Sequence, residues 1–365
     1  MSHLRLLILA AVVALVPLSW WWLSQRGASR PARLAALTAL ILFLTFDLIV
    51  FGAFTRLTDS GLGCPDWPGC YGHASPVGAQ ADIHAAQTAM PTGPVTAAKA
   101  WIEMIHRYLA MAVGGLILVA AGVAWRDRQQ LPHSPWWATV TLVWVIVQGL
   151  FGKYTVTLKL YPAIVTLHLL GAMVLLLLLV MQHVSFRPPP GWAAPDRLLA
   201  RRAAWVLALV MAQAALGGWV STNYAVLACS GFPSCSGQWW PEMDLTAGFT
   251  VLRELGRDAQ GGYLPFAALV AIHWVHRLFA MVVAVAVLAL AAALMKRAAL
   301  QRQGRWLVLL VVCQIITGVS NVVLGWPIVA ALAHTAGAAA LVGVLGSLWA
   351  ASRVLQAPGQ ALSAR

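Results

Sequence analysis

Charged residues are scarce in this sequence: Asp, Glu, Lys and Arg make up 10% of its 365 residues, whereas soluble domains carry roughly 25%. This scarcity excludes an ordinary soluble globular protein. Acidic residues are the fewest, 11 against 24 Lys and Arg, so the formal net charge is +13. A basic excess can indicate nucleic-acid binding, but here the basic residues lie in short segments between long apolar runs. That placement is typical of a protein that crosses a membrane several times, and it excludes nucleic acid as the expected partner.

Nine apolar runs follow one another along the chain, most of them near the roughly 20 residues that a transmembrane helix needs. The shortest, 136–152, begins with Trp136 and Trp137, which are typical of a membrane interface. The sequence therefore predicts an all-α integral membrane protein in contact with the lipid bilayer. The expected spans are 4–23, 34–54, 101–124, 136–152, 161–184, 203–221, 264–294, 306–324 and 328–351.

Lys and Arg gather in one set of connecting segments. Arg26, Arg30 and Arg33 follow the first run, and similar clusters follow the third, fifth, seventh and ninth runs. The positive-inside rule places these segments and the C-terminus in the cytoplasm. The two segments that contain cysteine pairs then face the outside. We expect a multi-pass protein of a bacterial-type inner (plasma) membrane.

Two of the outward-facing segments resemble one another, CPDWPGC from Cys64 to Cys70 and CSGFPSC from Cys229 to Cys235. Both cysteines are displaced by 165 positions, as are the preceding Leu, the shared Pro and the following Gly. A common offset predicts an internal duplication, which gives two pseudo-symmetric four-helix bundles. The expected division is an extra N-terminal helix and basic linker (1–33), a first bundle (34–185), a cytoplasmic linker (186–202), a second bundle (203–352) and a cytoplasmic tail (353–365).

The first run, 4–23, could instead be a cleaved signal peptide. Its end, SWWWLSQRGASR, is bulky and basic and lacks the small-residue pattern of a cleavage site. We therefore expect a retained helix with its N-terminus outside, in addition to the eight spans of the two bundles.

Five of the 10 histidines lie within the expected spans, where ionisable residues are rare and usually functional. The duplication pairs His106 with His276 and His168 with His334, on the second and fourth spans of each half and at similar depth. Two imidazoles on facing helices could ligate a heme iron from both sides of the macrocycle. Hydrogen bonding between helices would explain a single histidine but not two pairs in register. A zinc site would need further ligands at the same depth.

Two arginines and one carboxylate accompany these histidines. Arg107 and Arg277 directly follow His106 and its repeat mate, where they suit heme propionates, although they could also extend to lipid headgroups. Glu103 lies one helical turn before His106, and His273 takes its place in the second half. A carboxylate at this depth resists ionisation unless it is partnered, so Glu103 is a candidate for proton transfer or charge stabilisation. The asymmetry predicts that one half carries out chemistry while the other carries electrons.

The motifs GAFTRLTDSGLGCPDWPGC, EMIHR and HRLFA, together with the spans around His168 and His334, resemble the heme A synthase family over residues 34–352. The resemblance implies oxidation of the ring methyl of heme O to the formyl group of heme A, which terminal oxidases use. It implies that His106 and His168 bind the substrate heme, with Glu103 essential for turnover, and that His276 and His334 hold a heme b cofactor. A heme O synthase, an electron-transfer protein and a second copy of the chain are further candidate partners.

Both cysteine pairs are expected on the oxidising side of the membrane, where disulfides persist. We expect disulfides between Cys64 and Cys70 and between Cys229 and Cys235, each shaping a cap over a heme site. Thiol–disulfide exchange with a reductant is the alternative. Cys313 lies within a span and is expected to be inert.

Two other functions stay open at this point. A diheme b-type electron carrier of a quinone-linked oxidoreductase would use the same four histidines but would not need Glu103. A transporter built from repeated bundles would leave the histidine pairs unexplained. Extraction of the bound hemes separates the three, because only the enzyme would contain heme O or heme A beside heme b.

Overall fold

The computed structural model describes residues 2–131, 133–186 and 194–354. Across these ranges the chain is helical, and its extended contacts are isolated bridges in loops. Nine helices of the described chain are long and apolar enough to cross a membrane, which confirms the predicted fold class. They are α1 (Ser2–Ser24), α2 (Arg30–Leu57), α4 (Ala97–Arg126), α5 (Trp136–Thr157), α6 (Pro162–Phe186), α7 (Arg197–Thr222), α9 (Phe266–Met295), α10 (Gln301–Val323) and α11 (Ile328–Val354). Residues 187–193 of the expected linker and residues 355–365 of the expected tail lie outside the described residues.

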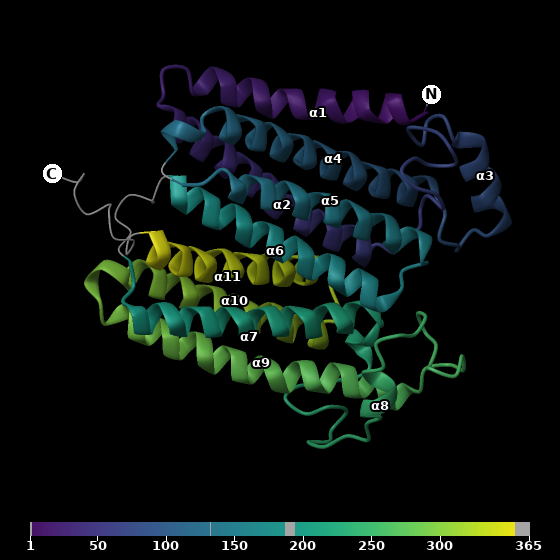
Figure 1. The fold of residues 1–365 in the computed structure, drawn as a ribbon. Coiled ribbons are helices and arrows are strands. Elements are labelled where there is room, and N and C mark those ends of the chain that lie inside the picture. The colour runs from purple at the N-terminus through teal and green to yellow at the C-terminus, as the bar shows by residue number, and fades with distance from the viewer. Residues whose placement is uncertain (1, 132, 187–193, 355–365) are drawn as a thin grey trace.

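The long helices form two stacked groups, α2, α4, α5 and α6 in one and α7, α9, α10 and α11 in the other (Figure 1). Within the first bundle α4 and α6 are diagonal, because each packs against both α2 and α5. In the second bundle α9 and α11 are diagonal in the same way, each packing against α7 and α10. The two bundles thus have equivalent arrangements, which is consistent with an internal duplication.

The bundles meet through α2, α6, α7 and α11. α11 approaches α6 closely at Gly346, where an added Cβ would overlap the Leu177 side chain. Small residues at such contacts let helix backbones approach in a membrane, where van der Waals packing drives association. The largest cluster of buried apolar side chains accordingly continues from α2 and α6 into the four helices of the second bundle.

Matched positions of the two halves touch each other where α2 and α7 end. The Arg56 guanidinium donates to the backbone oxygen of Ser221 at 2.5 Å, and the Tyr224 hydroxyl donates to the Asp59 carboxylate at 2.7 Å. Each of these pairs is separated by 165 positions, the offset of the cysteine loops. A residue that contacts its own repeat mate must lie close to the axis that relates the halves, as in a twofold interface.

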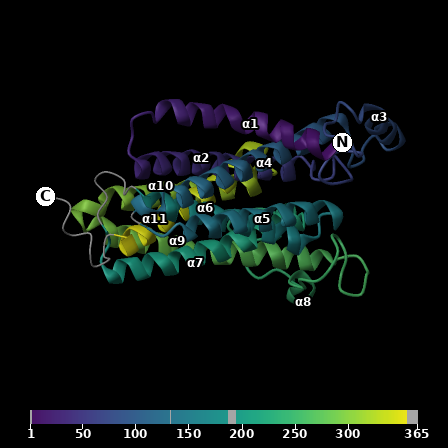
Figure 2. The same cartoon turned by 45° about the horizontal axis from the view of Figure 1, so that its top comes forward.

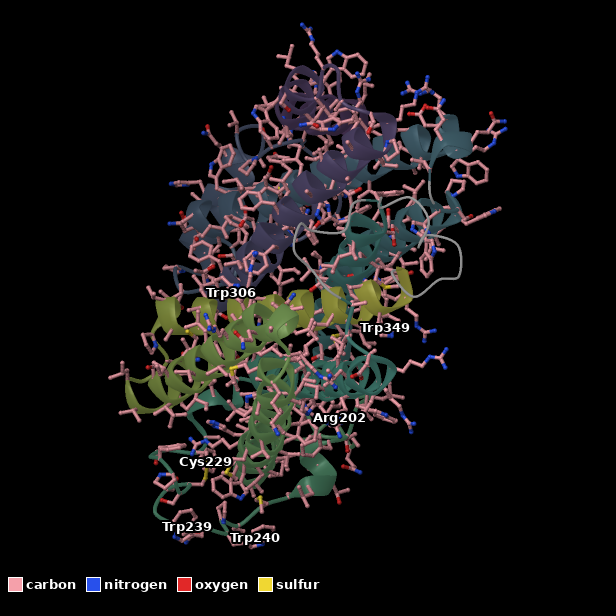
Figure 3. All side chains as sticks on the ribbon, turned by 90° about the vertical axis from the view of Figure 1, so that its left-hand side faces the viewer. Arg202, Cys229, Trp239, Trp240, Trp306 and Trp349 are labelled. Carbon is pink, nitrogen blue, oxygen red and sulfur yellow. A yellow bond between two sulfur atoms is a disulfide. The ribbon has the colours of Figure 1, made fainter. Side chains whose placement is uncertain are left out.

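Both cysteine loops lie at the same end of the bundles, with the short helices α3 (Gln80–Ala89) and α8 (Leu245–Gly248), and we call this the loop end (Figure 2). Cys64 and Cys70 form a disulfide, and so do Cys229 and Cys235. Figure 3 views the molecule from the opposite end, where Arg202 and Trp349 lie. Trp239 and Trp240 lie together at the loop end, on the Cys229 loop. Both of these tryptophans are exposed.

Helix α1 lies outside the two bundles and packs along α4 (Figure 1). One of its faces is buried, with Leu6, Ala10 and Ala14 at helical spacing, and the rest of the helix is largely exposed. The Trp21 indole N–H donates to the backbone oxygen of Arg33 at 2.9 Å, which fixes α1 to the start of α2. The extra helix therefore covers one side of the first bundle.

Candidate functional site

A cavity of about 1130 Å³ runs between the helices and is lined from both bundles. Typical sites for drug-sized ligands span roughly 300–1,000 Å³, so this cavity has room for large ligands. Most of its lining is apolar. All four paired histidines contribute to it: His106, His168, His276 and His334.

In the first bundle the two imidazoles come from the diagonal helices α4 and α6. Each ring lies beside a glycine of an intervening helix. A Cβ on Gly52 of α2 would lie 3.1 Å from Cε1 of His106, and one on Gly152 of α5 would lie 3.6 Å from Cε1 of His168. The missing side chains leave space for the rings at the cavity wall.

The second bundle repeats this arrangement with α9 and α11. A Cβ on Gly217 of α7 would lie 3.1 Å from Cε1 of His276, and one on Gly318 of α10 would lie 3.2 Å from Cε1 of His334. A glycine therefore lies beside an imidazole four times within the described residues. Because a contact at 3.1–3.2 Å is tighter than ordinary packing, a side chain at Gly52, Gly217 or Gly318 would crowd the neighbouring ring, whereas one at Gly152 would be at ordinary contact distance.

The donor set suits a planar macrocycle better than a bare metal ion. Each bundle brings two imidazoles from diagonal helices to the wall of an apolar cavity, and two such imidazoles suit a heme iron held from both faces. Groups of three or more His, Cys, Asp or Glu that could hold a metal ion do not occur in the described ranges. The residues present thus fit heme, as the sequence predicts.

The two histidine pairs differ in what holds their rings. Thr317 Oγ1 lies 3.0 Å from Nδ1 of His334 and 2.7 Å from the backbone oxygen of Cys313. The hydroxyl can donate to that oxygen and accept from the Nδ1 proton, which leaves the Nε2 lone pair for a metal. Gln213 Nε2 donates to the backbone oxygen of His276 at 3.2 Å and lies 3.0 Å from Nδ1 of its ring. Because an amide nitrogen only donates, this contact holds the ring in place but does not leave Nε2 of His276 unprotonated, as Thr317 does for His334. The rings of the second bundle are therefore oriented by polar neighbours.

The first bundle has no such neighbours at the matched positions, which hold Leu48 and Phe151. Nδ1 of His106 and Nδ1 of His168 are buried and make no hydrogen bond within the described part of the chain. Sequence reasoning missed this difference. The signal was present, because polar residues in one repeat face apolar residues in the other.

Glu103 forms a buried cluster with Arg107 beneath the first cysteine loop. Its Oε1 accepts from Nη2 of Arg107 at 2.6 Å, and its Oε2 accepts from the backbone N–H of Cys64 at 2.7 Å. Arg107 Nη1 donates to the backbone oxygens of Asp66 at 2.9 Å and Gly69 at 2.5 Å. Both side chains also line the cavity. Glu103 thus joins the His106 helix to the disulfide loop.

Arg277 takes the same position in the second half, with a different partner. Its Nε donates to Nε2 of His273 at 3.1 Å and its Nη1 donates to the backbone oxygen of Gly231 at 2.9 Å. Nη2 donates to the backbone oxygen of Cys229. Both predicted propionate-binding arginines therefore already bind loop carbonyls at the cavity edge, and their role toward propionates stays a prediction.

The loops and α1 complete the cavity wall. Trp67 and Phe232, at matched positions of the two cysteine loops, line the cavity from the loop end. Ala10 and Ala14 of α1 line it from the side of the first bundle. The disulfide loops are thus placed as caps, whereas the contribution of α1 was not predicted.

The sequence profile of the COX15-CtaA family, described as cytochrome oxidase assembly protein, matches residues 35–345. The chain is 37% identical over 312 residues to a heme A synthase of Shewanella oneidensis, an alignment that covers 85% of this chain and 93% of the relative. It is 29% identical over 349 residues to a heme A synthase of Rhizorhabdus wittichii, covering 88% and 94% of the two chains. These matches confirm the resemblance found in the motifs, and the chain belongs to the COX15-CtaA family of cytochrome oxidase assembly proteins.

Proposed function

We propose that this protein acts as a heme A synthase, an oxidoreductase that converts the ring methyl of heme O into the formyl group of heme A. The observation that carries the proposal is the pair of diagonal imidazoles in each bundle, facing one large apolar cavity. Its relatives bear the name heme A synthase. A diheme electron carrier would need the four histidines but gives no role to the Glu103 cluster.

The two halves have different roles, one binding the substrate and the other a heme cofactor. His106 and His168 bind the substrate heme O, close to Glu103, the carboxylate that the second half replaces with His273. His276 and His334 hold heme b, which supplies one-electron transfer when bound. The support for this assignment is the contact of Thr317 with His334, because a preset ligand ring suits a permanently bound cofactor.

Conversion of the methyl into a formyl group removes four electrons and adds one oxygen atom. With the oxygen at the level of water, R–CH3 and H2O give R–CHO, four protons and four electrons, and an electron-transfer protein accepts the electrons. The residues of this chain bind and orient the ring. Arg107 and the Cys64 N–H hold the Glu103 carboxylate at the cavity edge. There it stabilises positive charge on the reacting ring or accepts a proton from it.

The orientation of the protein in the membrane follows from its charge distribution, and its partners follow from the substrate. The cysteine loops face the outside of a bacterial inner membrane and the short basic connections face the cytoplasm. A heme O synthase would supply the substrate, and an electron-transfer protein would remove the electrons.

The proposal is tested by co-expression with a heme O synthase, followed by chromatography of the hemes extracted from purified protein. We expect heme A and heme b in the wild type. His106→Ala should contain heme b but no heme A, and His276→Ala should lose the heme b signal. Near-normal heme A in His106→Ala, or heme b as the sole heme in the wild type, would contradict the proposal.

A further inference from the structure

A glutamine at matched positions of the two bundles has different surroundings in each half. Gln314 of α10 donates from Nε2 to the backbone oxygen of His334 at 2.8 Å. Its repeat mate, Gln148 of α5, is 6% exposed and lines the cavity. Both its Nε2 and its Oε1 are buried without a hydrogen-bond partner among the described residues.

A buried amide in this state is costly, because it has lost its bonds to water and gained none from the protein. Native structures seldom keep such a group unless a ligand or an ordered water completes it. The same residue type is satisfied by the helix backbone in the second bundle. The first bundle therefore holds, on a residue that lines the cavity, a buried amide whose donor and acceptor have no partner among the described residues.

The position of this amide relative to the imidazoles indicates which part of a heme it meets. Gln148 lies one helical turn before Gly152, the glycine beside the His168 ring, and it packs over Gly171, where an added Cβ would overlap it. Both relations place the amide about one turn, roughly 5.4 Å, further from the loop end than the ring. That distance is comparable with the radius of a porphyrin. A porphyrin held between the His106 and His168 rings, with its plane along the helices, would therefore have its edge away from the loops at the level of the amide.

The two edges of the porphyrin meet different surroundings. The loop end offers backbone dipoles and the guanidinium groups of Arg107 and Arg277, which suit the ionised propionates. The opposite edge points into the apolar part of the cavity, which suits the isoprenoid tail. Heme O carries a hydroxyethylfarnesyl group where heme b has a vinyl group, so one hydroxyl accompanies the tail into this region.

We propose that the Gln148 amide hydrogen-bonds the hydroxyl at the base of the heme O tail and thereby selects heme O over heme b in the first bundle. This inference rests on the proposed function. A site with a buried group that pairs with a ligand hydroxyl rejects the analogue without it, since the group is left unpaired. The Gln314 amide is occupied by the His334 carbonyl, which matches a second site that takes heme b.

The test measures binding rather than turnover. Purified full-length protein with its second site filled is titrated with heme O or with heme b, and the Soret change of the first site is followed. The wild type should prefer heme O. In Gln148→Leu, which keeps a similar volume without polar atoms, we expect this preference to fall about tenfold, while the heme b spectrum of the second site is unchanged.

Gln314→Leu is the matched control and should leave the preference of the first site as in the wild type. The proposal is overturned if Gln148→Leu keeps the full preference, if it weakens both hemes equally, or if Gln314→Leu has the same effect. Should Gln148→Leu not fold, the wild type is titrated with a heme O analogue in which hydrogen replaces the hydroxyl. Equal affinity of the wild type for the analogue and for heme O would then overturn the proposal.

Failure of the proposed function gives a different result. In that case the wild type forms no heme A from heme O, whatever its binding preference. A wild type that makes heme A and whose preference does not depend on Gln148 contradicts this inference alone.

Discussion

Single residues at matched positions set the two halves apart. Glu103 has His273 as its counterpart, and both pair with the arginine that follows the first histidine of their half. The sequence revealed this exchange because the two motifs align. It did not reveal that Thr317 and Gln213 orient the second histidine pair, because those contacts join different helices. Which polar residue meets which ring depends on how the helices pack.

The Glu103 cluster leads to a prediction at this scale. Glu103→Gln keeps an acceptor for the Cys64 N–H but removes the charge that neutralises Arg107, which still has its loop carbonyls. We expect a folded protein with normal heme b whose conversion of heme O slows by about 10²–10³, as for loss of one electrostatic contribution in other enzymes. Chromatography of the extracted hemes, at equal protein levels, measures how much heme O each variant has converted to heme A.

His273→Gln is the matched control, since it alters the same position of the other half. It should be much milder in heme A yield. Equal damage from the two variants, or normal heme A in Glu103→Gln, would mean that the chemistry is not confined to the first half.

At the scale of the helices, hydrophobic runs predicted which segments cross the membrane but placed their ends poorly. The run 136–152 became α5, Trp136–Thr157, and 101–124 became α4, Ala97–Arg126. Both helices continue past the apolar run toward the loop end, where Thr96 caps α4 by accepting from the Lys99 N–H at 3.3 Å. Hydropathy marks only the apolar stretch of a helix and misses the more polar turns at its ends. It also gave no sign of α3 and α8, which are short and lie in the loops.

The glycines opposite the imidazoles lead to a prediction about helix packing. Gly217→Ala would put a Cβ 3.1 Å from Cε1 of His276, so the ring or α7 must shift. Overpacking of this kind costs about 1–3 kcal/mol, and we expect roughly tenfold weaker heme binding in the second bundle. The heme b content of the purified variant measures this loss of heme binding.

Gly122→Ala provides the control for that change, because the added Cβ would meet no described atom within 4 Å. Its heme b content should equal that of the wild type. A full complement of heme b in Gly217→Ala would show that the close contact does not position the ring.

For the whole molecule, the distribution of basic residues predicts which end faces the outside. Thr88 of α3 lies at the loop end and Ser29 lies between α1 and α2, and both are exposed. In a Cys313→Ala background, Thr88→Cys should react with a membrane-impermeant maleimide in intact spheroplasts. Ser29→Cys should react only after the membrane is opened. The reverse pattern would invert the assigned orientation.

The contacts of Arg56 with Ser221 and of Tyr224 with Asp59 bear on the origin of the molecule. A half-length ancestor with the same interface would have met its own copy at these positions, as a twofold homodimer. In such a dimer one gene specifies both heme pockets, so a carboxylate gained in one appears in the other. Fusion of two copies into one chain removes that constraint. Under the proposed division between the halves, only such a fused chain lets one pocket acquire Glu103 and the unpaired Gln148 amide while its twin holds heme b.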